Sequence, residues 1–224
     1  MRGVFVTGTD TGVGKSVLAG AICAALAARG ERVAAFKPVV TGLDAGAGGE
    51  WPPDHELLAA AAGGRQTAAE VAPYSFGPAV SPHLAAELAG QAIDPARILH
   101  AAAAAADDAD VLVCEGVGGL LVPITLGYSV RDLAIELALP VVVAARTGLG
   151  TISHTLLTIE AARAAGLAVA AVVMTPWREQ RDPIEESNRT TIERLARLPA
   201  LGLPQTRPGE LVHAGAVLPL DDWL

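Results

Sequence analysis

The sequence predicts an α/β domain with a mostly parallel sheet and helices on both faces. Short, almost wholly apolar runs such as 111–115 and 141–145 alternate with helical patterns along the chain. Strands of this kind are buried on both sides, which indicates parallel pairing between two helical layers. The 224 residues suit one domain, and no linker or internal repeat divides them. We therefore expect a single domain over residues 1–224.

Apolar runs and helix boundary signals place the elements in order. Gly30 and Gly166 follow two helical patterns and can end them. Asp94, which precedes a proline, is a helix N-cap, and Ser129 with Asp132 forms a capping pair. The expected strands are 4–6, 32–36, 111–115, 141–145 and 169–174. The expected helices are about 15–29, a short one from near 54, 94–106, 129–139, 151–165 and 183–198, with a loop over 42–53.

Charge and composition exclude several classes of protein. The formal net charge of −8 disfavours a surface that binds nucleic acid through many phosphate contacts. Cys23 and Cys114 are the two cysteines and lie in apolar stretches, so no disulfide framework is predicted and a reducing compartment is the default. The N-terminal apolar run does not fit a signal peptide, and no apolar stretch approaches the ~20 residues of a membrane span. We expect a cytoplasmic protein without a membrane or nucleic-acid partner.

A glycine-rich loop, GTDTGVGKS at 8–16, follows the first expected strand and precedes the first helix. A strand, a glycine-rich turn ending in Gly-Lys-Ser and a helix form the P-loop arrangement, although five residues here separate Gly8 from Gly14. The glycines let backbone N–H groups approach phosphate oxygens. Lys15 would reach the β- and γ-phosphates, and the Ser16 hydroxyl would bind Mg²⁺. An ordinary βα turn is the alternative, but the context favours nucleotide binding.

Lysine is rare in this chain. The basic residues are 14 arginines and two lysines, Lys15 and Lys37. A compact ammonium differs from a planar guanidinium in its approach to a single oxygen. Lys37 ends the second expected strand, at the edge where open α/β sheets bind ligands. We interpret Lys37 as the partner of an anionic group near the γ-phosphate; the alternative is a surface lysine without a role.

Two carboxylates are candidate Mg²⁺ ligands. Glu115 ends the third expected strand, and buried strand ends seldom carry an unpaired carboxylate. At this edge Glu115 can lie beside the phosphate loop and complete a magnesium shell. Asp54 follows two prolines at the start of a helix, and Glu56 comes soon after it. The pattern fits an N-cap as well as a metal ligand, and the residues alone do not decide between them.

Several motifs follow one another in a fixed order along the chain. They are GTDTGVGKS at 8–16, Lys37-Pro38-Val39 with Thr41-Gly42, Ser81-Pro82-His83, Glu115-Gly116 through Gly118-Gly119, Asp132, and Leu149-Gly150 through His154 and Thr158. A strand-ending Lys-Pro-Val and a Glu-Gly-x-Gly-Gly make the set specific, and it covers residues 4 to about 204. This ordered set resembles the ATP-dependent dethiobiotin synthetase family.

The resemblance implies a fold and an activity. It implies a P-loop NTPase-like, mostly parallel seven-stranded sheet and a homodimer with the active site near the subunit interface. The implied reaction uses ATP and Mg²⁺ to convert 7,8-diaminopelargonate and CO₂ or bicarbonate into dethiobiotin, ADP and phosphate. It passes through a carbamate and a carbamic-phosphoric anhydride, so the enzyme would be a C–N-bond-forming cyclo-ligase.

The resemblance also implies the site residues, and it assigns Asp54 to the metal. Ser16, Asp54 and Glu115 would hold Mg²⁺, and Thr11, Lys15 and Lys37 would be catalytic. Nucleotide contacts are expected from Gly12, Val13, Gly14, Lys15, Ser16, Val17, Asp54, Glu115, Gly116, Val117, Gly118, Thr175, Pro176, Pro204 and Gln205. Contacts to the diamine or its carbamate are expected from Thr11, Lys37 and Thr41, and contacts to its carboxylate from Gly150, Thr151, Ile152 and Ser153 of the neighbouring subunit.

The sequence departs from the family pattern at three positions. Thr41 replaces a common serine and keeps the hydroxyl, whereas Ser153 replaces a usual asparagine. Thr175 stands where many members carry the asparagine that reads the purine edge. The absence of that asparagine predicts weaker selection for adenine, so that other nucleoside triphosphates are accepted.

Two rival functions share this fold class. A partitioning-type nucleotide-switch ATPase usually has a second lysine early in the loop, where this chain has Thr9-Asp10. Such ATPases often end in an amphipathic membrane helix, and the ending LPLDDWL is too short for one. An amide-forming ligase acting on a cobalamin precursor normally needs a glutaminase domain, for which no residues remain. The synthetase is the preferred hypothesis.

Overall fold

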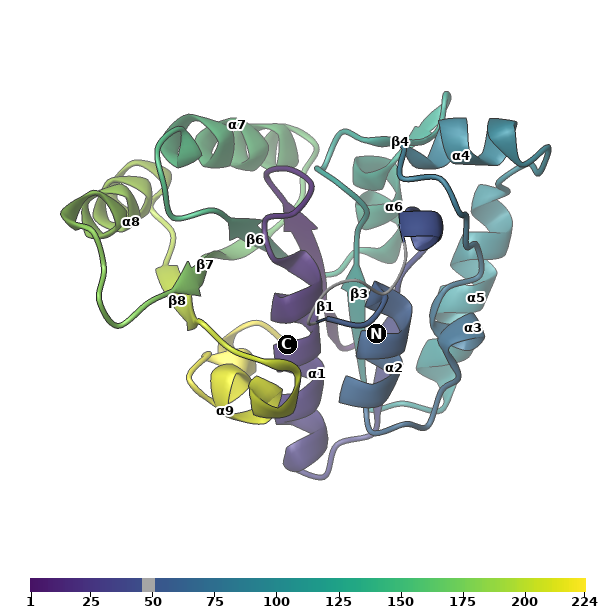
Figure 1. Cartoon of the computed structure of the whole chain (residues 1–224), viewed down its shortest axis with the longest axis horizontal. Helices are drawn as coiled ribbons and strands as arrows, with labels where there is room; N and C mark the ends of the chain where they lie inside the picture. The colour runs from purple at the N-terminus through teal and green to yellow at the C-terminus, as the bar shows by residue number, and fades with distance from the viewer. Residues whose placement is uncertain (46–50) are drawn as a thin grey trace.

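The computed structural model describes residues 1–45 and 51–224. Its main sheet has six strands in the order β2-β3-β1-β6-β7-β8, and every neighbouring pair is parallel. Helices lie on both sides of this sheet (Figure 1). The strands are β1 Gly3–Gly8, β2 Val33–Phe36, β3 Val111–Glu115, β6 Val141–Ala145, β7 Val169–Trp177 and β8 Ala200–Pro204.

The expected count of seven strands is wrong for the described residues, where the main sheet has six. Two further strands, β4 Pro123–Thr125 and β5 Tyr128–Ser129, form a separate antiparallel pair. β8 was absent from the expected elements because its sequence, ALGLP, contains a glycine and a proline, which are rare in strand interiors. Of the loop expected over 42–53, residues 46–50 lie outside the described part of the chain.

The expected helices form with small shifts at their ends, and three short helices were not expected. α3, α4 and α9 have too few turns for a helical pattern to be visible in the sequence. None of the helices described is both long and apolar enough to cross a membrane. The α-helices are α1 Lys15–Ala28, α2 Asp54–Ala61, α3 Ala68–Val71, α4 Pro82–Leu88, α5 Pro95–Asp107, α6 Val130–Leu137, α7 Thr151–Ala164, α8 Pro183–Ala196 and α9 Leu211–Ala216; 3₁₀ turns cover Leu43–Ala45, Pro208–Glu210 and Leu220–Asp222.

Alternate residues of each strand point to opposite sides of the sheet and build two hydrophobic cores. Val4 and Val6 of β1 belong to the core shared with α1, α2 and α9. Phe5 belongs to the opposite core, which contains side chains of α4 to α8. In Figure 1, α1 runs in front of β1 with α9 and α2 on its two sides. Burial on both faces explains why the strand sequences are almost wholly apolar.

The helix boundary signals mark the starts of α5 and α6. Asp132 N donates to Ser129 Oγ (3.3 Å), and Ser129 N donates to Asp132 Oδ2 (2.7 Å), which closes a capping box. Asp94 Oδ1 accepts a bond from Ala96 N (2.9 Å) at the start of α5. α2 differs, because Pro53 is its N-cap and no side chain caps it. Asp54 therefore does not cap this helix.

The outer edge of β2 is covered by side-chain and loop groups. Ala35 N donates to Gln66 Oε1 (2.8 Å), and Gln66 Nε2 donates to Ala35 O (3.1 Å). One residue beyond the strand, Lys37 N donates to Val71 O (2.9 Å). The Gln66 amide thus makes the pair of bonds that a neighbouring strand would make.

Arg32 and Asp110 form an ion pair where the chain enters β2 and β3. This pair predicts how the stability of the protein depends on pH. Arg32 Nη2 lies 2.6 Å from Asp110 Oδ1, and Arg32 N donates to Asp110 Oδ2 (2.8 Å). These bonds lower the pKa of Asp110 to about 2. The stabilisation is therefore complete above the usual carboxyl pKa and disappears as the pH falls through about 2. Carboxyl NMR titration should give this pKa, and in Arg32→Ala it should move towards its usual value; an unmoved pKa would contradict the assignment.

Candidate active site

The phosphate loop lies between β1 and α1, at the carboxyl end of β1, which is one of the two central strands of the sheet. Gly12 and Gly14 have φ of +69° and +86°, in the left-handed region that favours glycine. α1 begins at Lys15 without a side-chain cap, so its first N–H groups are free to bind an anion. A Cβ at Gly14 would overlap Thr175 Cγ2, so β7 packs directly against the loop. The loop has the geometry of a phosphate cradle.

Lys15 is held inside this loop. Its Nζ donates to Asp10 O (2.8 Å), and the residue is buried. Burial lowers the pKa of Lys15, because the attraction of nearby carboxylates such as Glu115 offsets only part of the cost of desolvation. The ammonium is therefore already positioned at the loop.

Lys37 bridges the two candidate carboxylates. Its Nζ lies 2.6 Å from Asp54 Oδ2 and 2.6 Å from Glu115 Oε1. The side chains of Lys37 and Glu115 are 4% and 0% exposed, whereas that of Asp54 is 41% exposed. Burial alone would lower the pKa of Lys37, but the two carboxylates outweigh it and raise that pKa. Lys37 also holds the pKa of Asp54 below its usual value against the effect of burial. The buried lysine is thus a charged partner of both acids.

The oxygen atoms around Ser16 and Glu115 fit a magnesium ion. Ser16 Oγ donates to Glu115 Oε1 (2.9 Å), and Glu115 Oε2 is buried without a hydrogen-bond partner. Among the residues described, no three acidic, histidine or cysteine side chains gather as a metal cage. Mg²⁺ does not need such a cage, because it takes one or two carboxylates and fills its shell with water and phosphate oxygens. A hydroxyl with two carboxylates suits this ion.

These groups line a cavity of about 680 Å³. The predicted residues that line it are Thr11, Gly12, Gly14, Lys15, Ser16, Val17, Lys37, Thr41, Asp54, Glu115, Val117 and Gly118. Val13 and Gly116 belong to the same loops but do not line it. The lining also includes residues that were not predicted, namely Trp51, Pro52, Leu57, Ala79, Val80, Ser81, Pro82 and Val122. Ser81 and Pro82 belong to a motif of the family resemblance, which could have indicated them; the others carry no such signal.

The predicted base-contacting residues lie outside the cavity lining. Thr175 and Pro176 are near the end of β7, and Pro204 and Gln205 are at the end of β8. Gln205 N donates to Trp177 O (3.1 Å), so the two strand ends stay together. The contact between Thr175 and Gly14 places this pair of ends beside the phosphate loop.

Residues 150–153 also lie outside the cavity lining and begin α7. Gly150 is the N-cap with φ of +89°, and no side chain caps the helix. The preceding turn reaches back to the phosphate loop, because Arg146 Nη2 donates to Thr11 O (3.0 Å). Thr151 N donates to Gly148 O (3.3 Å), and the N–H groups that follow it in this first turn form a second candidate anion site, separate from the cavity.

Comparisons of the sequence and the fold place the chain among known proteins. A family model described as an AAA domain matches residues 2–207. The fold resembles the cell division ATPase MinD of Pyrococcus furiosus (TM-score 0.54, 18% identity, 96% of this chain and 88% of that one). It also resembles the septum site-determining protein MinD of Pyrococcus horikoshii (TM-score 0.54, 15% identity, 95% and 86%). At these identities the likeness shows the α/β fold alone.

Sequence relatives are much closer. The ATP-dependent dethiobiotin synthetase BioD of Anaeromyxobacter dehalogenans is 42% identical over 208 residues, 93% of this chain and 92% of that protein. The enzymes of the same name from Novosphingobium aromaticivorans and Bacillus thuringiensis are 43% and 38% identical, and cover 90% and 94% of this chain. The alignments span 90% and 86% of those two proteins. The chain belongs to the ATP-dependent dethiobiotin synthetase family.

Proposed function

We propose that the protein converts 7,8-diaminopelargonate, CO₂ and ATP into dethiobiotin, ADP and phosphate. The full-length relatives support this activity. The structural observation that carries it is Lys37, whose ammonium lies buried between Asp54 and Glu115 beside the phosphate loop. A cation at that place can neutralise a carbamate and the phosphoryl group that it attacks.

The nucleotide would bind with its phosphates on the loop from Gly12 to Val17. The free N–H groups at the start of α1 and the Lys15 ammonium would hold the β- and γ-phosphate oxygens. Ser16, Asp54 and Glu115 would hold Mg²⁺, which would neutralise charge on those oxygens. The ends of β7 and β8, at Thr175-Pro176 and Pro204-Gln205, would contact the base.

The chemistry needs positioning and charge neutralisation more than covalent catalysis. One amine of the substrate attacks CO₂ and loses a proton to give a carbamate. A carbamate oxygen attacks the γ-phosphorus and releases ADP, which leaves a carbamic-phosphoric anhydride. The second amine attacks the carbonyl carbon, the C–O bond to phosphate breaks, and the ureido ring closes. Lys37 would stabilise the carbamate and the transferring group, with Thr11 and Thr41 contacting the diamine or its carbamate.

The distal carboxylate of the substrate needs a second site. Residues 150–153 of a neighbouring subunit would bind it with the N–H groups that begin α7. Their position outside the cavity lining supports a homodimer in which the partner completes the site. A single domain over residues 1–224 and a cytoplasmic location stay predictions.

The test is an assay of phosphate release with Mg-ATP and bicarbonate, with and without 7,8-diaminopelargonate. We expect release that depends on the diamine and a product with the mass of dethiobiotin. CTP and GTP should also support the reaction, because Thr175 replaces the usual asparagine. Slow release that is indifferent to the diamine would overturn the synthetase proposal. It would favour a nucleotide-switch ATPase, the alternative whose fold this chain shares.

A further inference from the structure

The turn between β6 and α7, residues 146–150, is joined to α8 by hydrogen bonds. Asn188 Nδ2 donates to Thr147 O (2.9 Å) and to Gly148 O (3.2 Å). Thr147 Oγ1 donates to Glu185 Oε1 (2.5 Å). Thr147, Glu185 and Asn188 are 8%, 9% and 7% exposed. Three hydrogen bonds, two of them buried and one partly buried, therefore join the first two turns of α8 to this loop.

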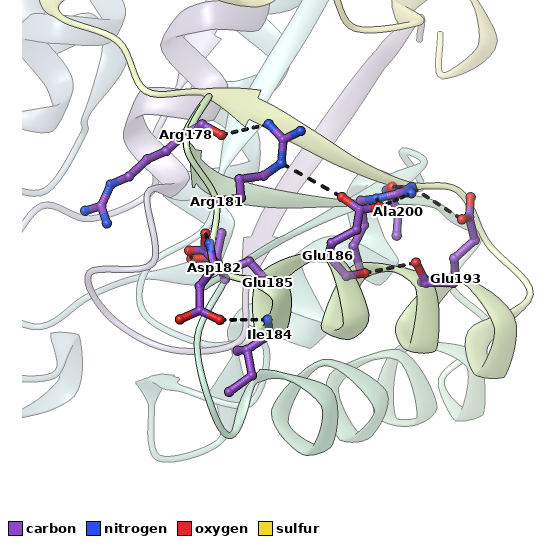
Figure 2. Close-up of polar contacts among 11 residues, drawn as sticks. Arg178, Arg181, Asp182, Ile184, Glu185, Glu186, Glu193 and Ala200 are labelled. Carbon is purple, nitrogen blue, oxygen red and sulfur yellow. Dashed lines mark hydrogen bonds and ion pairs between the residues drawn. The ribbon is translucent and has the colours of Figure 1, made fainter.

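The start of α8 is itself fixed. Asp182 Oδ1 accepts a bond from Ile184 N (2.8 Å), and Asp182 N donates to Glu185 Oε2 (3.2 Å) (Figure 2). One oxygen of Glu185 thus closes the capping box of α8, while the other accepts the bond from Thr147. The carboxylate couples the helix end to the turn.

The anchored turn is also bonded to α7 and to the phosphate loop. Thr151 Oγ1, in the first turn of α7, donates to Arg146 O (2.6 Å), and Arg146 Nη2 donates to Thr11 O in the phosphate loop (3.0 Å). The turn contains two glycines, and Leu149 at its tip is 94% exposed. Glycine gives the backbone conformational freedom, so the position of the turn depends on its anchors.

We propose that Asn188 and Glu185 are positioning residues for the substrate carboxylate. They fix the turn, the turn fixes the N–H groups that begin α7, and those groups receive the carboxylate of the diamine. Neither residue lines the active-site cavity. The inference rests on the proposed function, because it concerns the diamine of that reaction.

The test compares Asn188→Leu and Glu185→Leu with the wild type. We expect the KM for 7,8-diaminopelargonate to rise roughly 10- to 100-fold, since small displacements of a binding group have effects of this size. The KM for ATP should stay within about twofold. Glu185→Gln keeps an acceptor for Thr147 and should restore most of the affinity for the diamine. Isothermal titration calorimetry of diamine binding should show the same ranking.

Octane-2,3-diamine, which is the substrate without its carboxylate, separates positioning from general damage. The variants should react with this analogue at the wild-type kcat/KM. They misplace the N–H groups at the start of α7, and the analogue has no carboxylate for those groups to bind. Equal losses for both diamines would overturn the inference, as would an unchanged KM for the carboxylated diamine. If phosphate release by the wild-type protein did not depend on the diamine, the proposed function would be overturned, and the inference with it.

Matched variants test whether an effect on KM comes from loss of the fold. Glu193, labelled in Figure 2, lies on the same helix and pairs with Arg189 and not with the turn, so Glu193→Gln should behave as wild type. Thr147→Val removes only the hydroxyl that bonds to Glu185 and should raise the KM severalfold, with Thr147→Ser restoring it. A Thr147→Val protein that folds and binds the diamine normally would count against the role of Glu185.

Discussion

Replacing Lys37 with methionine is expected to lower kcat by about 10²- to 10³-fold, the usual loss when one charge-stabilising group is removed from a transition state. The ammonium lies 2.6 Å from carboxylate oxygens of both Asp54 and Glu115, at the edge where the phosphates would bind. Single-turnover phosphate release at saturating ATP and diamine measures the chemical step. A variant that keeps wild-type turnover would exclude Lys37 from the chemistry.

The same substitution should also destabilise the protein by roughly 3–5 kcal/mol, the usual cost of removing one partner of a buried ion pair. The cost comes mainly from Glu115, which is fully buried and would face Asp54 without the lysine. Urea unfolding in EDTA measures this loss. Lys37→Arg is the matched control, because it keeps the charge but not the compact ammonium. It should recover more stability than turnover; near-wild-type turnover in Lys37→Arg would contradict the assigned role.

Gly14→Ala is expected to destabilise the protein by about 1–2 kcal/mol from the left-handed backbone and by about 1–3 kcal/mol more from overpacking. Gly14 has φ of +86°, and its added Cβ would meet Thr175 Cγ2. The clash also displaces the start of α1, so the KM for ATP should rise. Thermal unfolding without nucleotide, together with ATP titration, measures both effects.

Gly12→Ala is the internal control for this prediction. Gly12 also has a positive φ, of +69°, but a Cβ there meets no atom within 4 Å. Its loss of stability should therefore be limited to the backbone contribution. Thr175→Ser removes the clashing methyl and should recover part of the stability of Gly14→Ala. Equal losses in Gly12→Ala and Gly14→Ala would show that packing against β7 is unimportant.

The parts of the fold that were predictable have strong local signals. β1 and α1 are separated by a glycine-rich loop, and the capping pair of Ser129 and Asp132 marks the start of α6. β8 was missed because its pairing with β7 supplies the strand structure that its own sequence does not favour. The short helices α3 and α4 were missed because they have too few turns for a helical pattern to be visible, although a capping box of Thr67 and Glu70 marks the start of α3.

Many of the predicted site residues line one cavity, but the sequence did not show how they are arranged or that the predicted base and carboxylate contacts lie outside its lining. Asp54 stood between two interpretations because helix starts favour an acid either as a cap or beside a ligand. In the structure Pro53 is the N-cap of α2, and Asp54 Oδ2 lies 2.6 Å from Lys37 Nζ. Strand register brings the other acid to the same lysine: Phe36 pairs with Cys114, so Lys37 and Glu115 leave neighbouring strands side by side. Asn188 gave no signal, because its bonds reach residues about 40 positions earlier in the chain. A single sequence contains no record of such long-range pairs.

The amide of Gln66 on the edge of β2 has a consequence for assembly. An exposed edge strand is a template on which another chain can add a strand, and such addition leads to uncontrolled association. The Gln66 side chain is hydrogen-bonded to both the N–H and the C=O of Ala35, and Val71 O accepts a bond from Lys37 N. At this edge the sheet cannot be extended by a second copy without first breaking these bonds. We therefore expect the proposed homodimer to form away from the β2 edge, with the carboxyl end of the sheet available to be shared between subunits.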